Sequence, residues 1–134
     1  MTHQANGTFE VNLAPLALAD NAADPMLGRM SIDKQFRGEL DATSRGEMLT
    51  AGTATRGSAG YVAIEKVSGS LQGRSGSFVL HHLGTMTRGN GHLSVHIVPD
   101  SGTGQLSGIT GEMRIRVADG KHYYELDYSL PDGL

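Results

Sequence analysis

One pair of alternating segments around a tight turn most constrains the fold. Residues 77–86 and 93–98 alternate between two faces, and they flank the sequence Arg88-Gly89-Asn90-Gly91. Because Asn-Gly is typical of two-residue hairpin turns, we expect a β-hairpin whose turn centres on Gly89-Asn90. Side chains of a strand point alternately to its two faces, so one face of this hairpin is apolar except for a single histidine. That face consists of Phe78, Leu80, His82, Met86, Leu93, Val95 and Ile97.

The rest of the chain repeats this hairpin pattern. We expect further strands over residues 8–13, 29–44, 47–55, 60–71 and 105–117, and a last strand after the Asp119-Gly120 turn. The other predicted turns lie at Arg45-Gly46, 56–59 and 73–76. Pairing across these turns places Val62 and Ile64 on the face of Leu80 and His82. Pairing across Asp119-Gly120 sets Ile115 opposite Tyr124 and Met113 opposite Leu126.

These segments predict an all-β protein, an eight-stranded antiparallel up-and-down barrel of the calycin-like kind. A sheet of this length with one apolar face closes because closure removes its edges, and a β-sandwich is the alternative. The 134 residues suit a single domain over 1–134. Residues 1–5 are expected to be a loose tail. Residues 14–27, interrupted by Pro15 and Pro25, are expected to be a long connection that caps one barrel end.

Composition excludes several classes of function. The chain has no cysteine, which excludes disulfides and thiolate metal sites and fits a cytoplasmic protein. A net charge of −3 without a cluster of basic residues argues against a nucleic-acid partner. No segment is long and apolar enough to span a membrane, and the first residues do not resemble a signal peptide. No spacing of histidines and carboxylates indicates a metal site, and we expect no cofactor.

The predicted inward face carries a small set of polar residues. They are Lys34, His82, His122, Tyr124 and Tyr128, whereas the carboxylates, Glu65 among them, are predicted to point outward. An unpaired buried cation is costly, so a bound anion could supply the missing charge, or Lys34 could reach solvent at a barrel mouth. His82 could act as a general acid or base and the tyrosines could donate to an oxyanion, although all can equally be packing residues. The candidate catalytic residues are His82, Lys34, Tyr124 and Tyr128.

The apolar members of the same face are the candidate ligand contacts. They are Phe36, Leu80, Met86, Val95, Ile97, Met113, Ile115 and Leu126. The opposite, outer face is also apolar in places, and such a patch commonly marks a subunit contact. We therefore expect a homo-oligomer formed through the outer face near Tyr61, Val79, Leu83 and Val98.

Several stretches resemble a bacterial family of unknown function whose barrel is similar to that of allene oxide cyclase. They are GTFEV at 7–11, GRMSIDKQF at 28–36, ATSRGEML at 42–49, GSAGYVAIE at 57–65, GRSGSFVL at 73–80, VPDSGTGQLSGITG at 98–111 and DGKHYYELDYSLP at 119–131. The resemblance covers nearly the whole chain and implies an eight-stranded antiparallel barrel. The resemblance does not identify any catalytic residues. The plant cyclase that gives the fold its name closes an unsaturated fatty-acid epoxide without a cofactor.

Three functions remain open at this point. The chain could be a barrel that binds a small apolar or weakly acidic molecule in its interior. It could instead be a cofactor-free isomerase or cyclase acting on an unsaturated or epoxide-type substrate. A completely filled barrel would leave only its exterior for function and would make the protein an interaction module.

Overall fold

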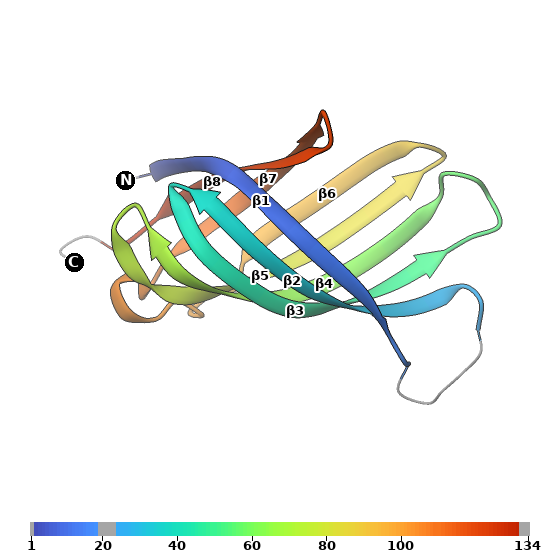
Figure 1. The fold of residues 1–134 in the computed structure, drawn as a ribbon, viewed down its shortest axis with the longest axis horizontal. Helices are drawn as coiled ribbons and strands as arrows, with labels where there is room; N and C mark the ends of the chain where they lie inside the picture. The colour runs from blue at the N-terminus through green and yellow to red at the C-terminus, as the bar shows by residue number, and fades with distance from the viewer. Residues whose placement is uncertain (1, 19–23, 132–134) are drawn as a thin grey trace.

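The chain folds into a closed barrel of eight antiparallel strands, as the sequence predicts. The computed structural model describes residues 2–18 and 24–131. Each strand pairs with its neighbours in sequence, and β1 pairs with β8 to close the barrel (Figure 1). The only helix among the described residues is a 3₁₀ turn, η1, at Gly104–Leu106. The strands are β1 (Thr2–Leu16), β2 (Leu27–Gly38), β3 (Leu40–Gly52), β4 (Ala59–Leu71), β5 (Arg74–Thr87), β6 (Asn90–Ile97), β7 (Thr110–Ala118) and β8 (Lys121–Ser129).

Three hairpins end in two-residue turns, Gln72-Gly73, Arg88-Gly89 and Asp119-Gly120. Both residues of each turn have positive φ, from 46° to 91°, which matches the twist of the flanking strands. The β7–β8 register is the predicted one, with Ile115 opposite Tyr124. The turn of the β5–β6 hairpin lies one residue earlier than predicted, so His82 pairs with Val95 instead of Ile97. Moving the turn by one residue shifts the pairing by two positions, and a shift of two keeps every side chain on its predicted face.

The β2–β3 hairpin differs from the prediction. The expected strand over 29–44 is interrupted at Gly38, which has a φ of 107°, and β3 begins at Leu40. The predicted turn Arg45-Gly46 lies inside β3, where Gly46 pairs with Ile32 on one side and with Glu65 on the other. The turn is at residues 38–40 because the backbone of Glu39 there hydrogen-bonds to Asn6 of β1 (3.2 Å) and to Gln72 of the neighbouring hairpin (2.8 Å).

The two faces of β4 are the reverse of the prediction. The turn after β4 is Gln72-Gly73 rather than residues 73–76, and its register sets Glu65 opposite Leu80 and Ile64 opposite His81. Glu65 therefore points into the barrel with no exposed surface, whereas Val62 and Ile64 are about half exposed, at 47% and 55%. The expectation that every carboxylate lies outside was wrong at Glu65.

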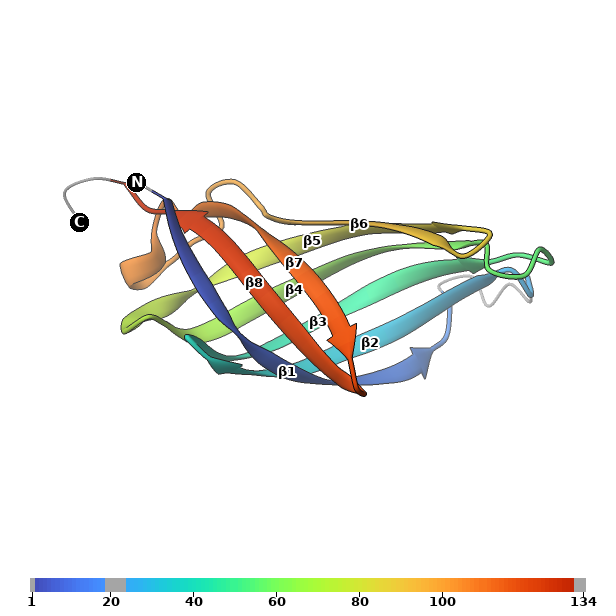
Figure 2. The same ribbon diagram turned by 90° about the horizontal axis from the view of Figure 1, so that it is seen from above.

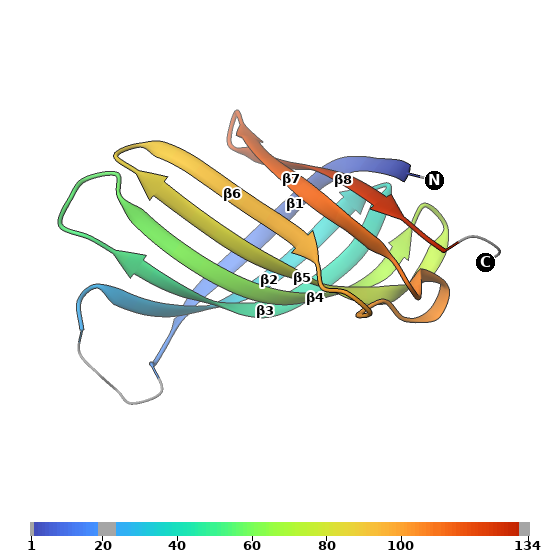
Figure 3. The ribbon, with the colours of Figure 1, turned by 180° about the vertical axis from the view of Figure 1, so that it is seen from behind.

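Two predictions about the chain's connections also need correction. Residues 2–5 are not a tail: they are part of β1 and pair with β8. The segment that covers a barrel end is the loop 98–109 (Figures 1 and 3). Its Leu106 and Ile109 are fully buried in the core. Part of the predicted connection over 14–27 belongs to β1, and residues 19–23 lie outside the described part of the chain. Its Leu18 and Leu27 lie against the exterior of the sheet.

The two ends of the barrel differ. At one end, which we call the packed end, the core is filled beneath the loop 98–109 and the turns at 38–40 and Gln72-Gly73. At the other, the open end, β2–β6 extend beyond the β7–β8 hairpin as a curved sheet (Figure 2). There β6 and β7 diverge. Among the described residues, these two strands pair only where His96 lies opposite Glu112. The packed end is made of Ala5, Phe36, Leu40, Leu71, Phe78, Leu80, Leu106, Ile109, Tyr124, Leu126 and Tyr128.

Candidate functional site

A carboxylate inside the barrel gathers three polar side chains from three strands. The Glu65 atom Oε1 lies 2.8 Å from Lys34 Nζ of β2 and 2.6 Å from His82 Nε2 of β5. The other oxygen, Oε2, accepts a hydrogen bond of 2.5 Å from the hydroxyl of Ser44 on β3. None of these four residues is more than 7% exposed. Together with Tyr61, which contacts His82, they form what we call the buried cluster.

The buried cluster is charged but balanced. Burial by itself raises the pKa of Glu65, but the hydrogen bond from His82, the charge and hydrogen bond of Lys34 and the hydroxyl of Ser44 outweigh it. The pKa of Glu65 is consequently lowered to about 2, so this carboxylate is ionised near neutral pH. Lys34 is therefore paired with an anion of the protein itself and does not require an anionic ligand. Its Nζ also lies 4.8 Å from the ring centroid of Phe9.

Tyr61 is the half-buried end of the hydrogen bonds in the buried cluster. Its hydroxyl lies 3.1 Å from His82 Nδ1, on the side of the ring opposite to Glu65. We assign the His82 proton to Nε2, because the carboxylate can only accept, and this leaves Nδ1 to accept from the Tyr61 hydroxyl. Burial, followed by the negative charge of Glu65, raises the pKa of Tyr61, so the phenol keeps its proton. The result is a continuous line of hydrogen bonds from Tyr61 through His82 to Glu65.

Tyr61 also borders a cavity at the open end. This inner cavity has a volume of about 570 Å³, and its lining includes Met48, Tyr61, Gly84, Met86 and Leu93. Gly84 is required beside the phenol ring, since a Cβ at this position would lie 2.4 Å from a Tyr61 ring carbon. Two of the lining side chains, Met86 and Leu93, are each 46% exposed. The cavity is thus mostly apolar, with the phenol of Tyr61 in its lining.

The structure brings together two of the four candidate catalytic residues. Lys34 and His82 both bind Glu65, as described. Tyr124 and Tyr128 instead lie at the packed end: the Tyr124 hydroxyl accepts from the Leu40 amide (2.8 Å), and the Tyr128 hydroxyl donates to the side chain of Gln72. Burial raises the pKa of each phenol. Both hydroxyls hold turns in place, and their catalytic role remains a prediction. His122, half-buried, packs on Phe9 at 5.0 Å between ring centroids.

The candidate ligand contacts divide between the two ends in the same way. Met86 lines the inner cavity. Ile115 is half-buried against the core. The other candidates are at most 5% exposed and fill the interior. They are Phe36, Leu80, Val95, Ile97, Met113 and Leu126.

The exterior of β2–β6 forms a second, larger hollow, which we call the outer groove. It has a volume of about 1400 Å³, and Leu49, Val62, Ile64, Val79 and Leu83 contribute its apolar surface. Val79 and Leu83 therefore lie on the outer face as predicted, and Val98 is half-buried just after β6. The prediction was wrong for Tyr61, which points inward to His82.

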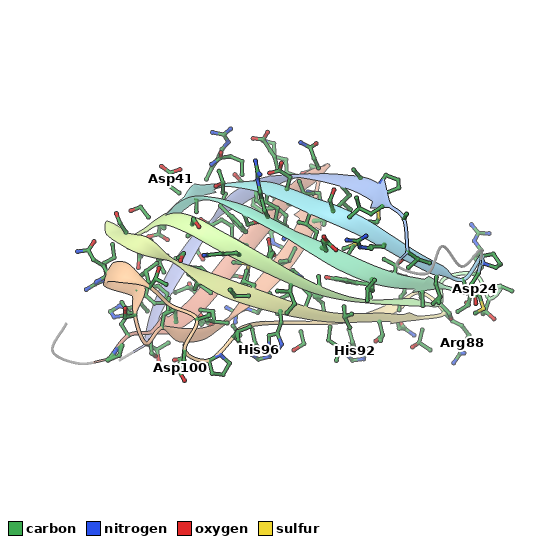
Figure 4. The ribbon with its side chains drawn as sticks, turned by 90° about the horizontal axis from the view of Figure 1, so that it is seen from below. Asp24, Asp41, Arg88, His92, His96 and Asp100 are labelled. Carbon is green, nitrogen blue, oxygen red and sulfur yellow. The ribbon has the colours of Figure 1, made fainter. Side chains whose placement is uncertain are left out.

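Two histidines lie side by side in the outer groove. His81 of β5 pairs directly with His96 of β6, and their ring centroids are 6.0 Å apart. Figure 4 shows His96 and His92 on the same side of β6. In the part of the chain that the structure describes, no three histidines or carboxylates are grouped to hold a metal ion. No described helix is long and apolar enough to cross a membrane.

Sequence reasoning missed three members of the buried cluster, Glu65, Ser44 and Tyr61. The apolar pattern of β4 favoured the opposite face, because Val62 and Ile64 belong to the apolar outer groove. One signal pointed to the missing acid. An inward Lys34 needs a carboxylate, and Glu65 is the one that a two-residue turn at Gln72-Gly73 places inside.

Comparison with known proteins gives the family. Residues 5–128 match the family described as protein of unknown function DUF3224. The chain belongs to the DUF3224 family. A crystal structure of a DUF3224 protein of unknown function from Shewanella oneidensis MR-1 superposes on this DUF3224 barrel with a TM-score of 0.93. It is 47% identical, and the alignment covers 99% of this chain and 100% of that one. No curated protein matches the chain.

Proposed function

We propose that this DUF3224 protein binds a small, largely apolar molecule in the inner cavity. The observation that carries the proposal is a cavity of about 570 Å³ with an apolar lining and one phenol whose hydrogen-bonding partner is buried. Cavities of this size, mostly apolar with a few polar groups, are typical of small-molecule sites. A polar group of the ligand would meet Tyr61, and the rest would pack on Met48, Met86 and Leu93. Because Glu65 already neutralises Lys34, an uncharged or weakly acidic ligand suits the site better than a strong anion.

The test is a fluorescence titration with Nile red, an uncharged dye that becomes bright in apolar cavities. Met86→Asp puts a charge in the inner cavity, and Ile64→Asp puts the same charge in the outer groove. We expect Met86→Asp to weaken dye binding at least about tenfold and Ile64→Asp to leave it unchanged, since burying a charge in an apolar site is costly. Loss of binding in Ile64→Asp with full binding in Met86→Asp would refute the proposal.

A cofactor-free isomerase or cyclase, of the kind that the likeness to the allene oxide cyclase barrel implies, is the second candidate. The hydrogen-bonded line from Tyr61 to Glu65 favours it, because such a line can move a proton at the edge of an apolar cavity. Both candidate functions require a small molecule in the inner cavity, so the dye titration tests the step that they share.

The partner that we propose for the outer groove is a second copy of the chain. Leu49, Val62 and Ile64 are each about half exposed there, at 53%, 47% and 55%, which is unusual for a surface that stays in water. The groove also contains Arg45 and Lys66 together with Glu47, so two copies can meet with opposite charges in contact. Light scattering should show an oligomer for the natural chain and a monomer for Ile64→Asp.

A further inference from the structure

We infer that Tyr61, coupled through His82 to Glu65, is a general base that removes a proton from a molecule bound in the inner cavity. The inference rests on the proposed binding function and adds a reaction to it. The substrate class is a small, mostly apolar carbon acid, a molecule with a C–H bond made acidic by a neighbouring electron-withdrawing group. This class follows from the apolar cavity lining and from the single polar side chain, Tyr61, that faces both the cavity and the buried cluster.

The order of burial decides which group meets the substrate. Glu65 is fully buried and His82 is 6% exposed, so neither is open to a molecule in the inner cavity. Tyr61 is half-buried and belongs to the cavity lining. A proton removed from the substrate therefore passes to Tyr61 first, and His82 and Glu65 act behind it.

The direction of the hydrogen bonds fits this task. The Tyr61 hydroxyl donates to His82 Nδ1 over 3.1 Å, and the oxygen retains a lone pair for a substrate proton. In the reaction step, the substrate C–H bond breaks and its proton binds the Tyr61 oxygen. The original Tyr61 proton moves to His82 Nδ1, and the electron pair of the C–H bond stays on the substrate. Return of the proton to a different carbon gives an isomer and restores all three side chains, so no other reactant is consumed.

Glu65 supports the step by staying ionised. It lies 2.6 Å from His82 Nε2, so its negative charge stabilises the imidazolium that forms when His82 takes the proton. A carboxylate plays the same part in serine–histidine–aspartate triads, where it sets the tautomer of the histidine and stabilises its cation. Lys34 contacts the same carboxylate oxygen, so its positive charge opposes the imidazolium.

The experiment uses nitrobenzisoxazole, a flat apolar carbon acid that opens when a base removes one proton. Its C–H proton goes to the base, the electron pair of that bond forms the nitrile, and the N–O bond breaks to give a coloured phenolate. No second catalytic group is needed, so the colour reports the base alone. We expect the natural protein to raise the rate above that of buffer and Tyr61→Phe to lower the protein-dependent rate about a hundredfold, the usual scale of general base catalysis.

Tyr123→Phe is the matched control, since it removes a phenol from the outer face of β8, where the ring packs on Arg116. It should leave the rate unchanged. His82→Gln should lower the rate while dye binding is retained, because it removes the group that accepts the Tyr61 proton, and a purely structural role of Tyr61 would not produce this result. Nile red binding is measured on each variant, so that a lost cavity is not mistaken for a lost base.

The outcomes separate the two proposals. A natural protein that binds the dye but opens nitrobenzisoxazole no faster than Tyr61→Phe overturns the inference and leaves the binding function standing. Absence of dye binding in the natural protein overturns the binding function. A dye-binding Tyr61→Phe variant that has lost the reaction supports the general base.

Discussion

The two ends of the barrel use tyrosine in opposite ways. At the packed end, the Tyr124 hydroxyl is hydrogen-bonded to the backbone of the β2–β3 turn, and its ring packs edge-on against Phe36 at 5.5 Å. At the open end, the Tyr61 hydroxyl bonds to a side chain, His82, and its ring borders a cavity. The same residue type therefore stabilises a turn where the core is complete and offers a reactive group where it is not. Hydrogen-bond partners and free volume, rather than residue identity, distinguish the two roles.

The strongest test of this contrast truncates one core residue at each end. Phe36→Ala removes a fully buried ring, and we expect it to lower the free energy of unfolding by about 4 kcal/mol. Met86→Ala removes a side chain that is 46% exposed, and the expected loss is below about 1 kcal/mol. Urea unfolding monitored by circular dichroism measures both. Equal losses would mean that the open end is as tightly packed as the other.

The buried cluster is the next target, because it lies between the two ends. Lys34→Met leaves Glu65 buried without its cation, and breaking such a pair is expected to cost about 3 kcal/mol of unfolding free energy. The double variant Lys34→Met with Glu65→Gln removes both charges and should recover much of that loss. The control is Glu47→Gln, which breaks an exposed ion pair with Arg29 and should cost less than about 1 kcal/mol. A double variant that is no more stable than Lys34→Met would contradict the pairing.

The same cluster predicts an acid dependence of stability. The pKa of Glu65 is about 2 in the folded chain, against an ordinary value of 4.5. A group with a lowered pKa stabilises the fold above its ordinary pKa and loses this contribution as the pH falls through the folded value. We therefore expect the natural chain to lose about 2 to 3 kcal/mol between pH 4.5 and pH 2 through this group. Glu65→Gln, unfolded in urea over the same range, should lack that part of the slope.

The smallest expected effect comes from Gly84. Gly84→Ala places a methyl group against the Tyr61 ring, and the ring must move because the added atom would lie 2.4 Å from it. We expect a loss of about 1 to 2 kcal/mol in unfolding free energy, the usual cost of overpacking. Dye binding in the inner cavity should change as well. Thr87→Ala, at the exposed end of the same strand, is the control. An unchanged cavity in Gly84→Ala would show that the ring is not confined.

Local turn chemistry explains how much of the fold could be predicted. Asp119-Gly120 gave the β7–β8 register directly, because that turn requires positive φ at both residues and the sequence supplies them. Gln72-Gly73 has the same geometry, but Gln72 is held there by distant groups: its backbone amide bonds to Glu39, and its side-chain amide bonds to Gln4. Contacts between residues so far apart in sequence leave no trace in a local pattern.

The candidate site was predicted in part for a related reason. Lys34 and His82 were placed inward correctly, since the strands that carry them have one clearly apolar face. β4 has apolar residues on both faces, Val62 and Ile64 outside and Ala63 and Val67 inside, so alternation could not decide its orientation. The sequence pattern consequently predicts Glu65 on the exterior and leaves Lys34 without a balancing carboxylate of the protein.

The divergence of β6 from β7 has a consequence for assembly. Where β6 and β7 separate, the backbone amide and carbonyl groups of one strand no longer bond to those of the other. An unpaired strand edge of this kind is a template for a strand from another molecule. A variant with a weakened β7–β8 hairpin should therefore aggregate by strand addition along β6. In a protein built as a ring of strands, the tendency to aggregate then depends on the junction of β6 and β7, where His96 lies opposite Glu112.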